Sequence, residues 1–307
     1  MGSSPVVGRL SDVCAGNISI FERGVLLSLA YTGNFYKDED DSRYIALKPQ
    51  RALVVGLGSM GKRYATALVN HEVISEENLY LCDIADTDLK QVFPKAVVSN
   101  SLTNLAHLLN SRGGLDIAVI ATPAETHLEI LAFLTDTFPW AGILMEKPIA
   151  DGALCDHPSI KVLAPELFTR LIAVGYNWRF HPFTRKVSAI AGSIQDVTLY
   201  VADEMDNWPG RYGHPLTEYS HEFDLIRCWT RDATVRQARE TRDGYVVRGD
   251  HALGLWTVKI RPHHTPRGRW VRLRLQDGAR ISYAWDRSEV EQTYELQLHH
   301  FLECWSK

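Results

Sequence analysis

The segment TEYSHEFDLIRCW, residues 217–229, places one histidine, His221, among three carboxylates, Glu218, Glu222 and Asp224. An imidazole changes its charge near neutral pH, so His221 could exchange a proton with a substrate. The same residues could instead be the polar face of a surface helix. The segment alone does not decide between a catalytic base and a solvated face.

A second candidate for proton chemistry is Lys147, in the segment LMEKPIA. It follows Glu146 at the end of a predicted strand, and Pro148 after it forces an extended backbone. A lysine before a proline is usually an incidental loop charge. The elements around Lys147 therefore decide whether a catalytic interpretation is reasonable.

Those elements alternate between short apolar strands and longer helices from residue 51 onward. The strands are predicted at RALVVG, NLYLCD, LDIAVIAT, AGILMEK and RLIAVGY, and the helices at SMGKRYATALVN, LTNLAHLLNS and AETHLEILAFLTDT. Strands that alternate with helices of this length indicate βαβ units and a parallel sheet. We therefore predict a doubly wound α/β Rossmann domain over residues 51–176. Lys147 then lies at the carboxyl edge of the sheet, where ligands bind, and this favours a catalytic role.

The turn after the first strand, VVGLGSMGKRY, contains Gly56, Gly58 and Gly61 as a GxGxxG motif. It comes directly after a strand and directly before a helix. In that context the glycines allow a tight turn and a close approach of the backbone to a pyrophosphate at the helix start. The turn, with Ser59 and Met60 inside it, predicts a dinucleotide site rather than a tight turn without a ligand.

The strand NLYLCD ends in Asp83, 22 residues after Gly61. A carboxylate there can accept both hydroxyls of an adenosine ribose and repel a 2′-phosphate, which favours NAD over NADP. Lys62 and Arg63 lie close by in the sequence and keep NADP possible. The alternative for Asp83 is a helix cap or a loop carboxylate.

The segment IATPAETH follows the strand LDIAVIAT at the same carboxyl edge. Thr122, Pro123 and His127 are therefore expected near the cofactor, together with Glu146. A proline that opens a helix is also ordinary capping, so a cofactor contact from Thr122 is left open.

After residue 175 the pattern changes to a helix at HPFTRKVSAIAG, a strand at QDVTLYVADE, a helix at SHEFDLIRCW and several further strands. The strand VRLRLQ alternates, with Val271, Leu273 and Leu275 on one face and Arg272 and Arg274 on the other. We predict an α+β domain over residues 177–307 with a mainly antiparallel, open-faced sheet. Helices cover one face, and the other is open or paired with a second subunit. Residues 1–50 form an N-terminal extension of unknown role.

The composition is that of an ordinary two-domain globular protein: 307 residues, 45% apolar and 23% charged, with a net charge of −4. This balance predicts no general attraction to nucleic acid or to an anionic membrane. No segment suggests a membrane span or an export signal. The five scattered cysteines favour a cytoplasmic location, and the adjacent histidine pairs complete no metal site.

Taken together, the segments GLGSMGKRY, ATPAETH, MEKP, GYNWRFHP and SHEFDLIRCW resemble the Gfo/Idh/MocA oxidoreductases, named for glucose-fructose oxidoreductase and inositol dehydrogenase. The resemblance covers about residues 51–229, and the joint pattern is far more specific than the glycines alone. Residues after 229 match the family only in their general pattern, and they end in the family-like ELQLHHFLECW. The resemblance implies a Rossmann domain followed by an α/β domain whose open sheet binds substrate on one side. Such sheets often form oligomers, so a homo-oligomer is expected.

The resemblance also implies NAD(P)-dependent hydride transfer to or from a sugar, nucleotide-sugar or cyclitol-like substrate. Lys147 matches the family lysine that contacts the reacting hydroxyl. His221 matches the histidine of the HxxD helix and would take the hydroxyl proton. A buried lysine beside a positive nicotinamide ring can exchange protons near neutral pH.

Further substrate contacts are expected from GYNWRFHP, which supplies Asn177, Arg179 and His181. Arg179 is the best candidate for binding an anionic group, with an interdomain salt bridge as the alternative. Asp224 is expected to orient His221 or its helix.

One departure from the family pattern is Thr217, because many members carry an aspartate four residues before the histidine. Glu218 is expected to serve as a catalytic residue instead, since i and i+3 share a helix face. A first-turn carboxylate favoured by the helix dipole is the alternative for Glu218, and Glu222 is expected at the surface.

Two further functions stay open. Thr217, with a C-terminal domain shorter than is usual for the family, could indicate a catalytically inactive dinucleotide-binding protein with a regulatory or scaffolding role. The second alternative function is the reduction of imine (C=N) bonds. This reaction would need Lys147 less.

Overall fold

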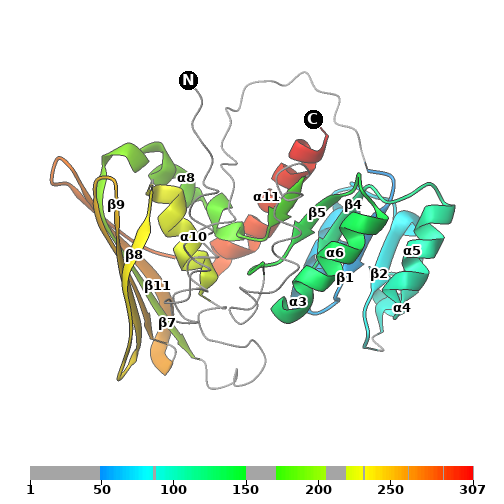
Figure 1. The fold of residues 1–307 in the computed structure, drawn as a ribbon, viewed down its shortest axis with the longest axis horizontal. Coiled ribbons are helices and arrows are strands. Elements are labelled where there is room, and N and C mark those ends of the chain that lie inside the picture. The colour runs from blue at the N-terminus through cyan, green and yellow to red at the C-terminus, as the bar shows by residue number, and fades with distance from the viewer. Residues whose placement is uncertain are drawn as a thin grey trace. The chain divides into compact units, whose positions relative to one another are not determined.

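The computed structural model of the chain describes residues 49–85, 88–149, 171–204, 219–230, 232–261, 263–285 and 287–306. Nearly all of the predicted N-terminal extension and the candidate Glu218 therefore lie outside the described residues. The chain forms two compact units, which are described separately below (Figure 1). The Rossmann unit contains the described residues of 49–149, 171–175 and 294–306, and the antiparallel unit those of 176–293.

The Rossmann unit is built on a six-stranded parallel sheet in the order β3-β2-β1-β4-β5-β6. Its strands are β1 (Ala52–Val55), β2 (Leu79–Cys82), β3 (Val97–Ser99), β4 (Ile117–Ile120), β5 (Gly142–Met145) and β6 (Ile172–Val174). Its helices are α3 (Ser59–Asn70), α4 (Leu89–Val92), α5 (Leu102–Ser111) and α6 (His127–Thr137), with 3-10 turns η1 (Glu76–Asn78) and η2 (Ala124–Thr126). The predicted doubly wound α/β fold is confirmed.

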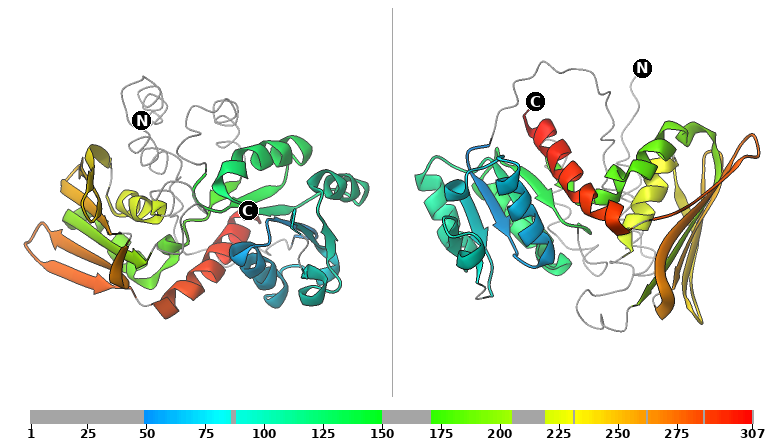
Figure 2. Two further views of the ribbon diagram at one scale, coloured as in Figure 1. Left: turned by 90° about the horizontal axis from the view of Figure 1, so that it is seen from below. Right: turned by 180° about the vertical axis from the view of Figure 1, so that it is seen from behind.

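Both faces of this sheet are covered, and for this reason strands β1, β2, β4 and β5 are buried at every residue. Helix α3 and the C-terminal helix α11 (Arg287–Trp305) contribute to the same core on one face, while α5 and α6 lie on the other (Figures 1 and 2). The division between the units falls within α11, because its residues from Tyr294 onward belong to the Rossmann unit. The final helix therefore completes the first domain's core.

The antiparallel unit contains a six-stranded sheet in the order β12-β11-β7-β10-β9-β8. Its strands are β7 (Ile194–Glu204), β8 (Thr234–Thr241), β9 (Gly244–His251), β10 (Gly254–Arg261), β11 (His263–Leu275) and β12 (Arg280–Ala284). The β7–β10 pair is parallel, and the other pairs are antiparallel. Its helices are α8 (Pro182–Ala189) and α10 (Ser220–Trp229), with 3-10 turns η5 (Asn177–Phe180) and η6 (Ala191–Ser193). The predicted mainly antiparallel sheet is confirmed.

Helices α8 and α10 lie against one face of this sheet, as Figure 1 shows. The predicted alternation of β11 is found: Val271 and Leu273 are buried in that core, whereas Arg272 and Arg274 are exposed on the opposite face. Within the described part of the chain, no helix covers this second face. No helix among the described residues is long and apolar enough to cross a lipid bilayer.

Candidate active site

The glycine turn between β1 and α3 contains two glycines that the backbone itself requires. Gly56 has a φ of +85°, and a Cβ there would lie 2.7 Å from the carbonyl oxygen of Ala121. A Cβ on Gly61 would overlap the carbonyl oxygen of Gly56. The turn can close, and α3 can pack on the sheet, because neither Gly56 nor Gly61 has a side chain.

Gly58 differs from both, because its φ is −65° and nothing lies within 4 Å of a Cβ built on it. Any residue could adopt this backbone without a clash, so folding does not require glycine at position 58. Gly58 leaves open space at the start of α3. In dinucleotide-binding folds the pyrophosphate approaches the backbone at this point. The chain thus has the cradle that such a cofactor needs.

The start of α3 is also suited to an anion. Its first turn carries no acidic residue and no side-chain cap. The first N–H groups of a helix have no acceptor within the helix, and the helix dipole is positive there. Ser59 is exposed at this end, while Met60 is half-buried against the core. The local charge and the exposed N–H groups favour a phosphate.

Asp83 follows β2 and binds the glycine turn directly. Its Oδ2 accepts a hydrogen bond from the backbone N–H of Leu57 at 2.5 Å, and its Oδ1 accepts one from Ala85 at 2.8 Å. Each carboxylate oxygen has more than one lone pair, so ribose hydroxyls can bind as well. Arg63, which could have bound a 2′-phosphate, lies over the ring of Tyr294 in α11, 5.4 Å from its centroid. This arrangement favours NAD.

Thr122, Pro123 and His127 lie at the carboxyl end of β4, as predicted. His127 has no exposed surface, and its Nε2 and Nδ1 lie 2.8 Å and 2.7 Å from the carbonyl oxygens of Thr122 and Pro148. Burial lowers the pKa of His127, and the two carbonyl groups oppose that shift. The neutral ring donates to one carbonyl at a time. His127 therefore ties the Thr122 turn to the segment after Lys147 and, as placed, has no surface for a cofactor.

Lys147 is half-buried immediately beyond β5, at the carboxyl edge of the parallel sheet. Glu146 before it is buried, and its Oε1 lies 2.8 Å from the hydroxyl oxygen of Tyr64 in α3. Its Oε2 accepts a hydrogen bond from the backbone N–H of Lys147 at 3.3 Å. Glu146 thus binds both the glycine-turn helix and the backbone of Lys147.

Helix α10 of the antiparallel unit is buried over most of its length. His221, Glu222 and Asp224 are only 6%, 2% and 1% exposed. The polar face of a surface helix is therefore ruled out, and the expectation that Glu222 lies at the surface is wrong. Glu222 is buried because its Oε1 accepts a hydrogen bond from Arg269 Nε at 2.9 Å.

Two aromatic rings contact His221 within the same unit. The ring of Tyr176 meets the imidazole edge-on at a centroid distance of 5.8 Å, and that of Trp178 is tilted at 5.9 Å. An arginine lies over each ring, Arg179 at 6.0 Å from the Tyr176 centroid and Arg269 at 4.8 Å from that of Trp178. The α10 carboxylates that bind these arginines thereby fix the surroundings of His221.

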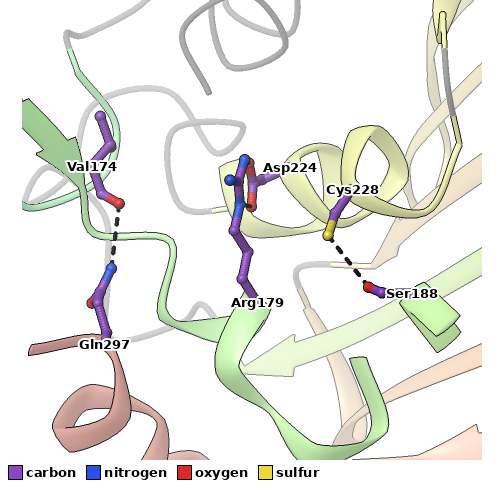
Figure 3. Close-up of polar contacts among 6 residues, drawn as sticks. All are labelled: Val174, Arg179, Ser188, Asp224, Cys228 and Gln297. Atoms are coloured by element: carbon purple, nitrogen blue, oxygen red, sulfur yellow. Dashed lines mark hydrogen bonds and ion pairs between the residues drawn. The ribbon is translucent and has the colours of Figure 1, made fainter. Parts of the chain in front are cut away.

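Arg179 and Asp224 form a buried bidentate ion pair, shown in Figure 3. Nε and Nη2 of Arg179 lie 2.7 Å and 2.5 Å from the two carboxylate oxygens. Burial alone would lower the pKa of Arg179, but the Asp224 carboxylate raises it, so the guanidinium stays charged. The alternative predicted for Arg179 was an interdomain salt bridge, but both partners of this ion pair belong to the antiparallel unit.

Asn177 and His181 have no exposed surface. Asn177 Nδ2 donates to Thr293 Oγ1 at 2.7 Å, and His181 Nδ1 accepts from the backbone N–H of Phe183 at the start of α8. As placed, both residues stabilise their own unit. The substrate contacts of Asn177 and His181 stay predictions.

Several of these partners had no signal in the sequence. Arg269, the partner of Glu222, belongs to no motif. Gln297, the partner of Tyr64, lies in the family-like ELQLHHFLECW, where no role was assigned to it. Tyr64 could have been noticed, because it lies one residue beyond the GxGxxG pattern's basic pair and on the buried face of α3. Tyr176 and Trp178 lie within GYNWRFHP, next to the predicted substrate residues, but the sequence indicated no role for them.

A parallel sheet, a glycine turn at a helix start and a carboxylate at the end of the next strand define a dinucleotide-binding Rossmann protein. Residues 50–170 match the Gfo/Idh/MocA family, described as an oxidoreductase family with an NAD-binding Rossmann fold. Over these residues the chain therefore matches the NAD-binding Rossmann domain of an oxidoreductase family. The resemblance and the expected cofactor are thereby confirmed.

Solved structures extend the likeness over both units. GenD2 from gentamicin A biosynthesis, in complex with NAD, is 17% identical, with a TM-score of 0.68 over 87% of this chain and 89% of its own. A myo-inositol dehydrogenase from Corynebacterium glutamicum is 14% identical, with a TM-score of 0.70 over 83% of this chain and 88% of its own.

The WlbA (WbpB) dehydrogenase from Thermus thermophilus, in complex with NAD and UDP-GlcNAcA, is 21% identical, with a TM-score of 0.63 over 84% of this chain and 91% of its own. At these identities the structures show a common fold. No curated protein matches the chain in sequence.

Proposed function

We propose that the protein transfers a hydride between NAD and a hydroxyl-bearing carbon of a sugar, cyclitol or nucleotide sugar. The observation that carries the cofactor half of this proposal is the open space at Gly58, which the fold does not need and a pyrophosphate does. The substrate class is supported by the solved relatives, which include an inositol dehydrogenase and a dehydrogenase bound to a nucleotide sugar.

The roles of individual residues follow from their positions and from the family pattern. Bound NAD supplies the hydride acceptor or donor. Asp83 binds the adenosine ribose, and the start of α3 binds the pyrophosphate. Lys147 contacts the reacting oxygen of the substrate, and His221 takes the hydroxyl proton, with Asp224 and Glu222 holding its surroundings. Glu218, which the structure does not describe, is proposed as a supporting carboxylate on the family pattern alone.

The glycine turn offers a matched test of the cofactor site. Gly58→Ala is expected to leave the melting temperature unchanged and to raise the Kd of NADH at least about tenfold, or about 1.4 kcal/mol. Gly61→Ala is expected to lower the melting temperature, because its Cβ meets the Gly56 carbonyl. Thermal unfolding and NADH fluorescence titration measure both quantities. An unchanged NADH affinity in Gly58→Ala would argue against a pyrophosphate at this turn.

The preference for NAD rests on the charge of Asp83. Asp83→Asn keeps an oxygen for the N–H of Leu57 but removes the charge that repels a 2′-phosphate. It is expected to raise the Kd of NADH about tenfold or more and to lower that of NADPH, since hydrogen bonds to charged groups contribute about 1.5–3 kcal/mol. Competition between the two cofactors in wild type and variant checks this. Equal affinities in the wild type contradict it.

We also propose a cytoplasmic homo-oligomer that uses the helix-free face of the antiparallel sheet. Leu255 and Trp270 on this face are 54% and 37% exposed. The cytoplasmic location is proposed from the scattered cysteines of the sequence, which form no CxxC pair. Sedimentation of the purified protein tests the assembly, and a monomer at all concentrations would contradict it.

A further inference from the structure

Arg227, in the last turn of α10, has a buried donor without an acceptor. Among the residues that the structure describes, its Nη1 makes no hydrogen bond, and the guanidinium forms no ion pair. A donor that is buried without an acceptor costs free energy, and a charged donor costs more. The residue as a whole is half-buried, so its side chain is within reach of a small ligand. The guanidinium therefore has a donor available for a group outside the described residues.

The carboxylate that acts on the charge of Arg227 already has another partner. Among the described residues this carboxylate is Asp224, three positions earlier on α10. Its two oxygens lie 2.7 Å and 2.5 Å from Nε and Nη2 of Arg179, as Figure 3 shows. Burial, and after it the positive charge of Arg179, lowers the pKa of Arg227, while Asp224 opposes that shift. An arginine stays protonated at neutral pH even so, and Arg227 is therefore a cation beside another cation.

The groups around Arg227 also surround His221. Tyr176 is close enough to affect the pKa of Arg227, and its ring meets the imidazole of His221 edge-on. Arg179 lies over that same ring. Arg227 and His221 are six positions apart on one helix, so their Cα atoms are separated by about 9 Å along its axis. A substituted sugar is long enough to span that distance.

The helix dipole alone does not account for Arg227. The last turn of a helix favours a cation, but such a side chain normally bonds the last carbonyls or faces water. The buried Nη1 of Arg227 does neither. A guanidinium presents its donors as a planar fork that matches two oxygens of a carboxylate or a phosphate. The unused donor of Arg227 therefore fits an oxyanion.

We propose that Arg227 binds an anionic group, a carboxylate or a phosphate, of the substrate whose hydroxyl reacts at His221. This assignment rests on the proposed function and narrows its substrate to an acidic sugar or a nucleotide sugar, because a neutral cyclitol has no anionic group for Arg227. Anion binding, which the sequence suggested for Arg179, is thereby assigned to its neighbour. Asp224 neutralises Arg179 and leaves Arg227 for the ligand.

Thermal unfolding of the full chain without ligand tests whether Arg227 already has a partner in the protein. Arg227→Met is expected to leave the Tm unchanged or to raise it, because it removes a cation that has no partner and lies beside Arg179. Arg239→Met, at an exposed arginine of β8, is the matched control and should leave the Tm unchanged. A fall of the Tm in Arg227→Met alone would overturn the proposal, since a carboxylate of the chain or the helix dipole would then already use this charge.

Added anions test the ligand directly. In excess inorganic phosphate or acetate, at constant ionic strength and with saturating NAD⁺ to occupy the start of α3, the Tm of the wild type is expected to rise by about 2 °C or more. Most of that rise should disappear in Arg227→Met and remain in Arg239→Met. A rise with phosphate alone assigns a phosphate group to the site, and a rise with acetate alone assigns a carboxylate. The same response in wild type and Arg227→Met, or no response in either, would overturn the proposal.

A kinetic measurement tests whether the anion belongs to the substrate. With the substrate identified for the wild type, Arg227→Met is expected to raise KM about 10–100-fold, the range of a hydrogen bond to a charged group, and to change kcat little. An unchanged KM would refute the assignment of the anion to the substrate. Absence of turnover in the wild type would refute the proposed function, whereas the anion-dependent rise of the Tm would still assign an oxyanion to Arg227.

Discussion

Lys147→Met is expected to lower kcat by about 10²–10⁴-fold, the range that a positioned acid or base contributes. The Kd of NADH should change little, because the cofactor's pyrophosphate and adenosine bind at α3 and Asp83. The physical reason is that methionine fills the space of lysine without its ammonium group, so the reacting oxygen loses its polarising contact. Following NADH absorbance with the substrate identified for the wild type measures the effect.

The surface residue Lys95 provides the control for this experiment. Its side chain is 66% exposed and pairs with Glu77, so Lys95→Met removes a lysine from the same unit without affecting the site. If Lys147→Met retains most of the wild-type kcat, the oxygen is not activated by Lys147, and an imine reductase becomes the better account. A protein that binds NADH but never changes its absorbance with any polyol or sugar would support a non-catalytic role.

Arg179→Met is expected to lower the free energy of unfolding by about 3–5 kcal/mol, the usual cost of leaving a buried charge without its partner. Asp224 is 1% exposed and would keep a carboxylate that water cannot reach. Urea denaturation of wild type and variant measures the difference. The same substitution should also loosen Tyr176, whose ring lies under Arg179 and against His221.

An exposed ion pair of the same unit is the control for the buried Arg179–Asp224 pair. Arg236 pairs with Asp250, but its side chain is 68% exposed, so Arg236→Met is expected to cost only about 0–1 kcal/mol. The double variant Arg179→Met/Asp224→Leu should recover much of the lost stability, because no buried charge remains. Equal effects of Arg179→Met and Arg236→Met would show that burial does not govern the Arg179–Asp224 pair.

The architecture could be predicted from the sequence because its signals are local. Strands β1, β2, β4 and β5 of the Rossmann sheet are apolar runs buried on both faces, and the turn at Gly56 comes directly after β1. Strand β3 was not predicted, since three half-buried residues provide neither a long run nor a period. Nothing in the sequence indicated that α11 completes the core of the first unit, because that depends on where the chain returns in space.

The candidate site could be predicted only in part, because sequence motifs are local. Motifs located Asp83, Lys147 and His221, but the partners of these side chains depend on tertiary packing. Glu222 meets Arg269 47 residues away, and Tyr64 meets Gln297 233 residues away. The general rule that a glutamate on a helix faces water failed for Glu222 because the half-buried Arg269 binds it.

The most direct test of the central claim is a crystal structure of the wild-type protein with NAD⁺. We predict that the pyrophosphate lies on the backbone at Gly58, that the adenosine ribose binds Asp83, and that the nicotinamide ring lies beside Lys147. A dinucleotide bound elsewhere on the chain, or a nicotinamide ring remote from Lys147, would contradict the account.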